Sequence, residues 1–152
     1  MDLSENILAE GTKRNPHIDF NSRTGELILA GKSIPENAAK VYEPLLQWIE
    51  KYLEAPRPTT NLRLNLEYFN TATSIWLAKI VKSLCGIDKE DHSVFIHLYF
   101  DLEDFDDMET DDLKDIVGSL LDNVAEIKVN LAIRTYGIDD KGKILKESTI
   151  LV

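Results

Sequence analysis

The chain has 152 residues, the usual size of one domain, with 43% hydrophobic and 29% charged residues. Its 17 Lys and Arg against 27 Asp and Glu give a formal net charge of −10, which disfavours nucleic acid and membrane surfaces as partners because both are anionic. It contains no signal segment, no apolar run of the ~18 to 20 residues that span a bilayer, and one cysteine, which cannot form an internal disulfide. We therefore expect a single cytoplasmic domain, residues 1–152.

The first patterned segment is HIDFNSRTGELILAG, residues 17–31, in which two extended runs flank a turn rich in Asn, Ser and Gly. This pattern predicts a β-hairpin. A helix should follow, because Ser33 and Glu36 have the spacing of a capping box and apolar residues then recur at three- and four-residue steps through residues 38–53. Pro44 is expected to kink this helix or split it in two.

Three later segments alternate apolar and polar residues with the period of a β-strand. They cover residues 62–69, 94–100 and 127–134, and helical spacing separates them at residues 77–84 and 113–121. In the first strand Tyr68 should point the same way as the leucines and Phe69 the opposite way. In the second, His97 is interpreted as a surface or interface residue rather than a base.

Strands that alternate with helices predict parallel neighbours, and strands with one apolar face predict a sheet covered on one side only. We therefore predict an α/β fold. It should be a two-layer α/β sandwich with a mixed β-sheet, helices mainly on one face and an N-terminal β-hairpin. The lone Cys85 lies in an apolar helical segment and is interpreted as a buried packing residue.

A cluster of hydroxyl groups stands where the strand gives way to the second helix, in YFNTATSIW, residues 68–76. The free N–H groups of a helix start collect there, so Asn70 or Thr71 suffices as an N-cap, which is usually worth ~1 kcal/mol. The same geometry accommodates a phosphoryl group, which adds about −1.5 to −2 charge at pH 7. From the residues alone, Thr71, Thr73 and Ser74 are either helix-start residues or a modification site.

The order PENAAKVYEPLLQWIEKYL, then LRLNLEYFNTATS, then VFIHLYFDLEDFDDM resembles the SiaC family of bacterial regulatory phosphoproteins over about residues 10–121. Gly11, Thr12 and Pro16 match the Gly-Thr-x-x-x-Pro opening of that family. The resemblance implies a protein that is not an enzyme, and we expect no metal or cofactor. It also implies that phosphorylation of the threonine after the Asn of YFNT, here Thr71, controls which partner is bound. The residues expected to form the switch loop and contact partners are Tyr68, Phe69, Asn70, Thr73 and Ser74.

The partners that the resemblance implies are a cognate kinase with a histidine-kinase-like ATPase fold and a PPM-type phosphatase. The unphosphorylated form would bind and activate a diguanylate cyclase, raising cyclic di-GMP and favouring biofilm formation. Two features depart from the family pattern. Ile75 stands where family members commonly have a lysine, and residues 136–152 are longer than usual and are expected to extend the sheet.

The acidic run between Asp101 and Asp115 contains nine carboxylates and one lysine. It lacks the ligand spacing of an EF-hand, so we interpret it as a solvated loop and helix start without a metal. Asp104, Asp106 and Asp107 form a possible acidic surface toward a basic partner. Two other functions stay open: a structural module that binds peptides or proteins without a phosphoswitch, and a small metal-dependent hydrolase.

Overall fold

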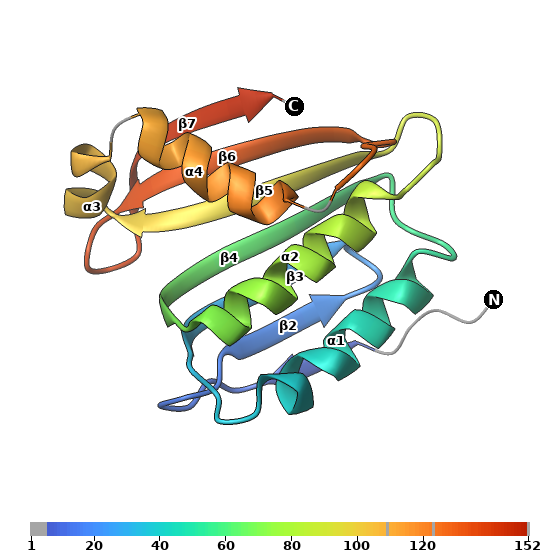
Figure 1. Cartoon of the computed structure of the whole chain (residues 1–152), viewed down its shortest axis with the longest axis horizontal. Coiled ribbons are helices and arrows are strands. Elements are labelled where there is room, and N and C mark those ends of the chain that lie inside the picture. The colour runs from blue at the N-terminus through green and yellow to red at the C-terminus, as the bar shows by residue number, and fades with distance from the viewer. Residues whose placement is uncertain (1–5, 109, 123, 152) are drawn as a thin grey trace.

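The computed structural model describes residues 6–108, 110–122 and 124–151 and shows one seven-stranded sheet whose strands lie side by side in chain order (Figure 1). The three strands at the amino-terminal side are antiparallel, β3 to β6 are parallel, and β7 is antiparallel to β6. The strands are β1 (Ile7–Ala9), β2 (His17–Asn21), β3 (Glu26–Ser33), β4 (Thr59–Phe69), β5 (Ser93–Asp101), β6 (Asn130–Ile138) and β7 (Ile144–Leu151).

The helices lie on one face of this sheet; α1, α2 and α3 each follow a strand, and α4 follows α3 (Figure 1). They are α1 (Ala38–Tyr52), α2 (Thr71–Cys85), the short α3 (Leu102–Asp107) and α4 (Thr110–Leu121). The predicted two-layer α/β sandwich with a mixed sheet is therefore confirmed, including the amino-terminal hairpin of β2 and β3. The expected final strand is also present as β7 and extends the sheet beyond β6.

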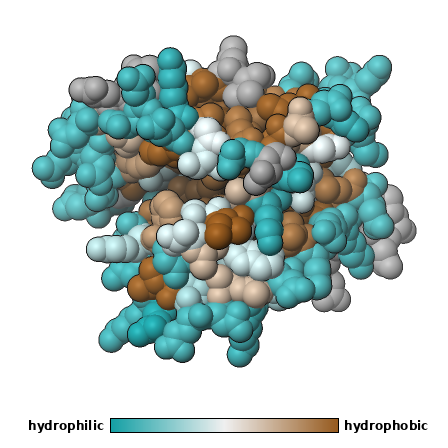
Figure 2. All heavy atoms as spheres, in the orientation of Figure 1, coloured by the Kyte–Doolittle hydropathy of each residue, from teal (hydrophilic) through white to brown (hydrophobic). Residues whose placement is uncertain are grey.

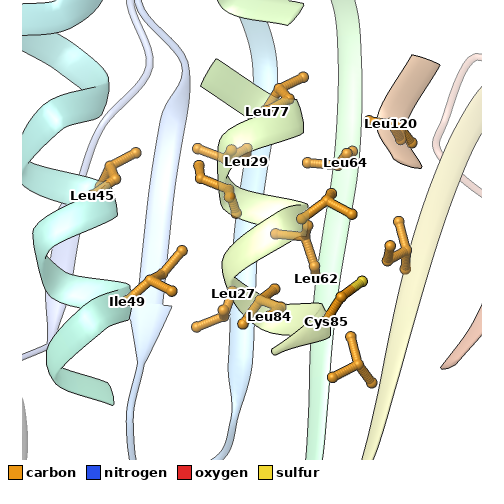
Figure 3. Packing of buried hydrophobic residues seen from close by; sticks show 14 of the residues in the cluster. Leu27, Leu29, Leu45, Ile49, Leu62, Leu64, Leu77, Leu84, Cys85 and Leu120 are labelled. Atoms are coloured by element: carbon orange, nitrogen blue, oxygen red, sulfur yellow. The ribbon is translucent and has the colours of Figure 1, made fainter. Parts of the chain in front are cut away.

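The core fills the space between the helices and the sheet. Leucines at every second position of β3 and β4 point toward the apolar stripes of α1 and α2, and Figure 3 shows Leu45 and Ile49 on the side of α1 that faces Leu27 and Leu29. Cys85 is buried among these residues, and its burial raises the pKa of the thiol to about 11. The thiol therefore stays protonated at neutral pH, as the packing interpretation requires.

The start of α1 differs from the prediction. Ser33 is the buried last residue of β3, and Asn37 is the N-cap, whose side chain accepts a hydrogen bond from the backbone N–H of Lys40. The capping box of Ser33 and Glu36 was therefore wrong. Pro44 lies inside a helix that is not split, and it is exposed, so water can reach the carbonyl that its missing N–H leaves without a helical partner.

The end of β4 also differs. A register shift after Gly31 pairs Lys32 with Tyr68 and Ser33 with Phe69, so β4 contains one extra residue there. Phe69 consequently shares the helix-covered face with Ser33, and Tyr68 lies on the opposite face. This reverses the predicted orientations of both aromatic side chains.

One further strand and one strand boundary were not predicted. The strand β1 was missed because it is only three residues long, and β6 begins at Asn130, so residues 127–129 precede the strand. In the part of the chain that the structure describes, no helix is long and apolar enough to cross a membrane.

Candidate functional site

The candidate site lies at the edge of the sheet where the parallel strands end. Strands β3, β4, β5 and β6 finish there at Ser33, Phe69, Asp101 and Ile138, and we call this the carboxyl edge. Side chains that follow parallel strands meet at such an edge, which is where open α/β sheets carry their functional groups. Only Asn70 separates β4 from α2, so the YFNT segment lies at this edge.

Asn70 fixes the start of α2. Its extended backbone, with φ −96° and ψ 174°, is that of an N-cap, and its side-chain oxygen accepts a hydrogen bond of 2.9 Å from the backbone N–H of Thr73. Its own N–H donates to the carbonyl of Ser33 at 3.1 Å. The capping interpretation is thus correct for Asn70, and the junction is tied to the neighbouring strand.

Thr73 is fully buried and joins three elements. Its hydroxyl donates to the Ser33 carbonyl at 2.9 Å, so it must accept from the Ser33 hydroxyl, which lies 2.9 Å away. The Ser33 hydroxyl in turn accepts from the Tyr42 hydroxyl of α1 at 2.6 Å. Burial raises the pKa of Tyr42, although its hydrogen bonds to Ser33 and Thr73 act in the opposite direction. Thr73 is therefore a structural residue whose hydroxyl no enzyme could reach without opening the fold.

Thr71 and Ser74 are placed differently. Thr71 is the exposed first residue of α2, and no hydrogen bond to the described residues holds its hydroxyl. The Ser74 hydroxyl is half-buried and donates to the Thr71 carbonyl at 2.7 Å. Of the three hydroxyl groups, that of Thr71 is the accessible one.

Exposed aromatic side chains flank Thr71. Tyr68 is 66% exposed and Phe69 53% exposed, which is unusual for large hydrophobic residues of a folded domain. Since the register shift sends them to opposite faces, they border the junction on both sides. Such residues are typical anchors in protein interfaces.

The predicted acidic residues lie on α3, which follows β5 at the same carboxyl edge. Asp104 lines a depression of about 720 Å³ together with Tyr68, Phe69, Asp139 and Asp140. Asp106 forms an exposed ion pair with Lys146 of β7, with 2.6 Å between carboxylate and ammonium, and Asp107 is exposed outside the depression. The structure therefore brings Asp104 beside the YFNT segment, and Asp106 is partly neutralised by its partner.

His97 was wrongly interpreted as a surface residue, since it is only 3% exposed. Its Nε2 lies 2.8 Å from the side-chain oxygen of Asn61 and its Nδ1 lies 2.6 Å from the Tyr136 hydroxyl. Because the amide oxygen only accepts, Nε2 carries the proton and Nδ1 accepts from the tyrosine. Burial, with the nearby Arg63 and Arg134, lowers the pKa of His97 to about 4, so the ring is neutral at pH 7.

Further side-chain hydrogen bonds and ring contacts lie near His97 on the outer face of the sheet. Arg63 donates to Glu26 at 2.6 Å and to the Tyr99 hydroxyl at 2.8 Å, and the Tyr99 ring stacks on that of Tyr136. Within residues 6–108, 110–122 and 124–151, no group of three or more His, Cys, Asp or Glu side chains could hold a metal ion.

A two-layer α/β domain with an accessible threonine hydroxyl at a helix start, bordered by exposed aromatic residues, offers a surface for a protein partner. Comparison with known proteins identifies the family. The model of the SiaC family of regulatory phosphoproteins matches residues 9–131, and the chain therefore belongs to this family.

Solved structures of similar fold come from Pseudomonas aeruginosa. Apo-SiaC is 19% identical with a TM-score of 0.64, and the alignment covers 85% of this chain and 98% of that one. A chain of the complex between the diguanylate cyclase SiaD and its activator SiaC is 20% identical with a TM-score of 0.64, covering 87% and 99%. At these identities the likeness establishes the fold.

A relative among curated proteins is an uncharacterized protein of Pseudomonas aeruginosa, 32% identical over 63 residues. The match covers 41% of this chain, and the chain spans about half the length of that relative.

Proposed function

We propose that this chain is a non-enzymatic partner switch controlled by phosphorylation of Thr71. The observation that carries the proposal is the contrast within one turn of α2: Thr71 is exposed, Thr73 is fully buried and the Ser74 hydroxyl donates to a backbone carbonyl. Membership of a family of regulatory phosphoproteins supports the assignment.

The start of α2 suits a phosphate electrostatically. The helix has 15 residues, so its dipole favours negative charge at Thr71, and no acidic residue occupies its first turn. A phosphoryl group on Thr71 would add about −1.5 to −2 charge at an exposed point, leaving the Thr73 hydrogen bonds in place. Phosphorylation would therefore change the surface that a partner meets while the core keeps its packing.

The proposed cycle uses three partners. A cognate kinase with a histidine-kinase-like ATPase fold adds the phosphate, a PPM-type phosphatase removes it, and the unphosphorylated form activates a diguanylate cyclase in the cytoplasm. The kinase and phosphatase rest on the sequence resemblance. The cyclase is supported by the solved complex of SiaC with SiaD. Higher cyclic di-GMP and biofilm formation would be the output.

Incubation with the cognate kinase and ATP, followed by intact-mass and peptide mass spectrometry, tests the site. Wild type and Thr71→Ser should each gain one phosphoryl group, because serine keeps the hydroxyl, and Thr71→Ala should gain none. The PPM-type phosphatase should reverse the gain. Phosphate on Thr71→Ala at the wild-type level would refute the assignment.

A second measurement separates the switch from a structural binding module. Thr71→Asp should weaken binding to the diguanylate cyclase, whereas Thr71→Asn, which has the same shape without the charge, should bind nearly as wild type. Equal affinities for both variants would favour a module in which this position only starts the helix.

A further inference from the structure

A groove lies between α2 and α4, beside the proposed switch. The two helices are closest at their carboxyl-terminal ends and diverge toward their amino-terminal ends (Figure 1). The divergence leaves a cavity of about 360 Å³ above the ends of β4 and β5. Its apolar lining includes Leu64, Phe69, Leu77, Leu98, Ile116 and Leu120.

A second hollow of about 500 Å³ lies between residues of the same two helices. Both hollows are lined by Ser74 of α2 and Ser119 of α4, so they adjoin, and we call the two together the α2–α4 groove. In the second hollow the α2 wall carries Ile75, Lys79 and Lys82. The groove thus has an apolar floor at one end and charged walls at the other.

Large apolar side chains are exposed at this groove. Ile75 is 55% exposed at its α2 wall and Phe69 is 53% exposed at its open end. Figure 2 shows hydrophobic side chains at the surface in the recess between the two helices. An exposed apolar surface bordered by charged residues indicates a surface for a protein partner.

We propose that the α2–α4 groove binds one amphipathic α-helix of the effector protein. The occupant presents large apolar side chains to the floor of the groove. Its flanks are of opposite charge, because Lys79 and Lys82 line the α2 wall and Asp122 lines the α4 wall. An acidic flank would face the two lysines and a basic flank would face α4, which fixes the orientation of the bound helix.

The lining favours a helix over a small molecule. Ligand pockets orient their ligands with a few convergent polar groups, but the Ser74 hydroxyl already donates to the Thr71 carbonyl, and leucine side chains dominate the floor. Two helices that enclose an apolar groove offer the ridges against which a third helix packs.

The groove is geometrically linked to Thr71, and in this respect the inference rests on the proposed function. Thr71, Ile75 and Lys82 stand at steps of four and seven residues, so they lie on one face of α2. A phosphate on Thr71 would place its charge one helical turn from Ile75, at the entrance of the groove. It would repel the acidic flank of the occupant.

Binding of the full-length cognate diguanylate cyclase, measured by isothermal titration calorimetry, tests the groove. Ile75→Glu should weaken binding at least about tenfold, as expected for an interface anchor. The matched control is Ile144→Glu on β7, whose side chain is 47% exposed and lies outside the groove; its affinity should stay within about twofold. Circular dichroism and thermal unfolding of each variant verify the fold.

Overlapping 20-residue peptides from the cyclase identify the occupant. One peptide that becomes helical on binding should compete with the cyclase, and Lys82→Glu should weaken that peptide if its acidic flank faces α2. Competition only by an extended peptide, or by none, would overturn the helix assignment.

The outcomes separate the two proposals. If Ile75→Glu binds the cyclase as wild type while Thr71→Asp does not, the groove inference fails and the switch stands. If Ile75→Glu abolishes binding but the kinase never modifies Thr71, the groove stands and the switch fails. A wild-type chain that forms no complex with the cyclase overturns both.

Discussion

Thr71 and Thr73 differ by two positions in one helix, and this spacing determines their roles. Residues two apart on an α-helix point to nearly opposite sides, so when Thr73 enters the core Thr71 must face outward. The hydrogen bonds of Thr73 to Ser33 hold the rotation of α2, and so keep Thr71 exposed. The buried Thr73 therefore positions Thr71 at the surface of the same junction.

His97 makes the stability of the protein depend on pH. Its folded-state pKa is lowered from the usual 6.5 to about 4 by burial and by the nearby Arg63 and Arg134. Between these values the unfolded chain binds a proton that the folded chain does not, so stability falls as pH decreases from 6.5 to 4. The expected loss across this window is roughly 3 kcal/mol.

Urea unfolding at several pH values between 4 and 7 measures this loss, with His97→Gln as the control. Carboxylates that titrate in the same range are common to both proteins and cancel in the difference. Because only the wild type contains His97, its unfolding free energy should fall relative to that of His97→Gln as pH decreases from 6.5 to 4. A difference that is constant with pH would show that His97 does not titrate as proposed.

The phosphorylation of Thr71, which the resemblance to the SiaC family implies, stays a prediction, whereas the burial of His97 could not be predicted from the sequence. Alternation places His97 on the outer face of β5, and periodicity contains no information about its neighbours. Those neighbours, Asn61 and Tyr136, are 36 and 39 residues away and meet it only through the pairing of β4, β5 and β6. Burial of an outward-facing residue is a tertiary property.

At the scale of elements, the hairpin of β2 and β3 depends on Gly25. Its φ of +75° is a conformation that favours glycine, and a Cβ added there would lie 2.5 Å from the backbone carbonyl oxygen of Thr59. The Gly25 carbonyl also accepts from the N–H of Asn61 at 2.8 Å, so the turn is fixed against β4. Backbone atoms on both sides leave no room for adjustment.

Gly142, in the turn between β6 and β7, provides a matched control. Its φ is +82°, but a Cβ there would meet nothing within 4 Å. Gly142→Ala should cost only the conformational strain, about 1–2 kcal/mol. Gly25→Ala should cost a further ~1–3 kcal/mol because of the clash, measured by urea unfolding. Equal losses would mean that the turn of the hairpin moves away from Thr59 without resistance.

Elements with long periodic patterns were predicted well, and their ends were not. The stripes of α1 and α2 and the alternation of β3, β4 and β5 gave the correct layers. Ser33 was misassigned because a serine before a helix resembles an N-cap whether or not the strand has ended. The register shift that reverses Tyr68 and Phe69 is set by pairing with β3, which the sequence of β4 alone does not encode.

At the scale of the whole molecule, the sheet has two unequal edges. One edge is the three-residue β1, and the other is the eight-residue β7, whose residues from Ile144 to Thr149 are all exposed. The family match ends at residue 131, so β7 lies outside the matched region. It carries Lys146 and Glu147, and charged residues of this kind keep an edge strand from pairing with other chains.

Removal of β7 should therefore destabilise the fold and promote association. A chain that ends at Asp140 would expose the edge of β6, in which Ala132, Ile133 and Tyr136 are buried. A loss of about 2 kcal/mol would lower the melting temperature by roughly 4–8 °C for a domain of this size. Light scattering after size exclusion should show a higher, concentration-dependent mass than that of the full chain.

The variant Lys146→Ala tests whether the ion pair with Asp106, rather than the backbone pairing of β7, protects the edge of the sheet. This variant loses only the exposed contact with Asp106, worth about 0–1 kcal/mol, and keeps β7 paired with β6. It should have the mass of the full chain and nearly the same melting temperature. If the truncated chain instead matches the full chain in both measurements, β6 already protects its own edge, and β7 adds surface for a partner rather than stability. If Lys146→Ala associates as strongly as the truncated chain, the charge on β7, and not its backbone pairing, is what keeps the sheet from extending into a second copy.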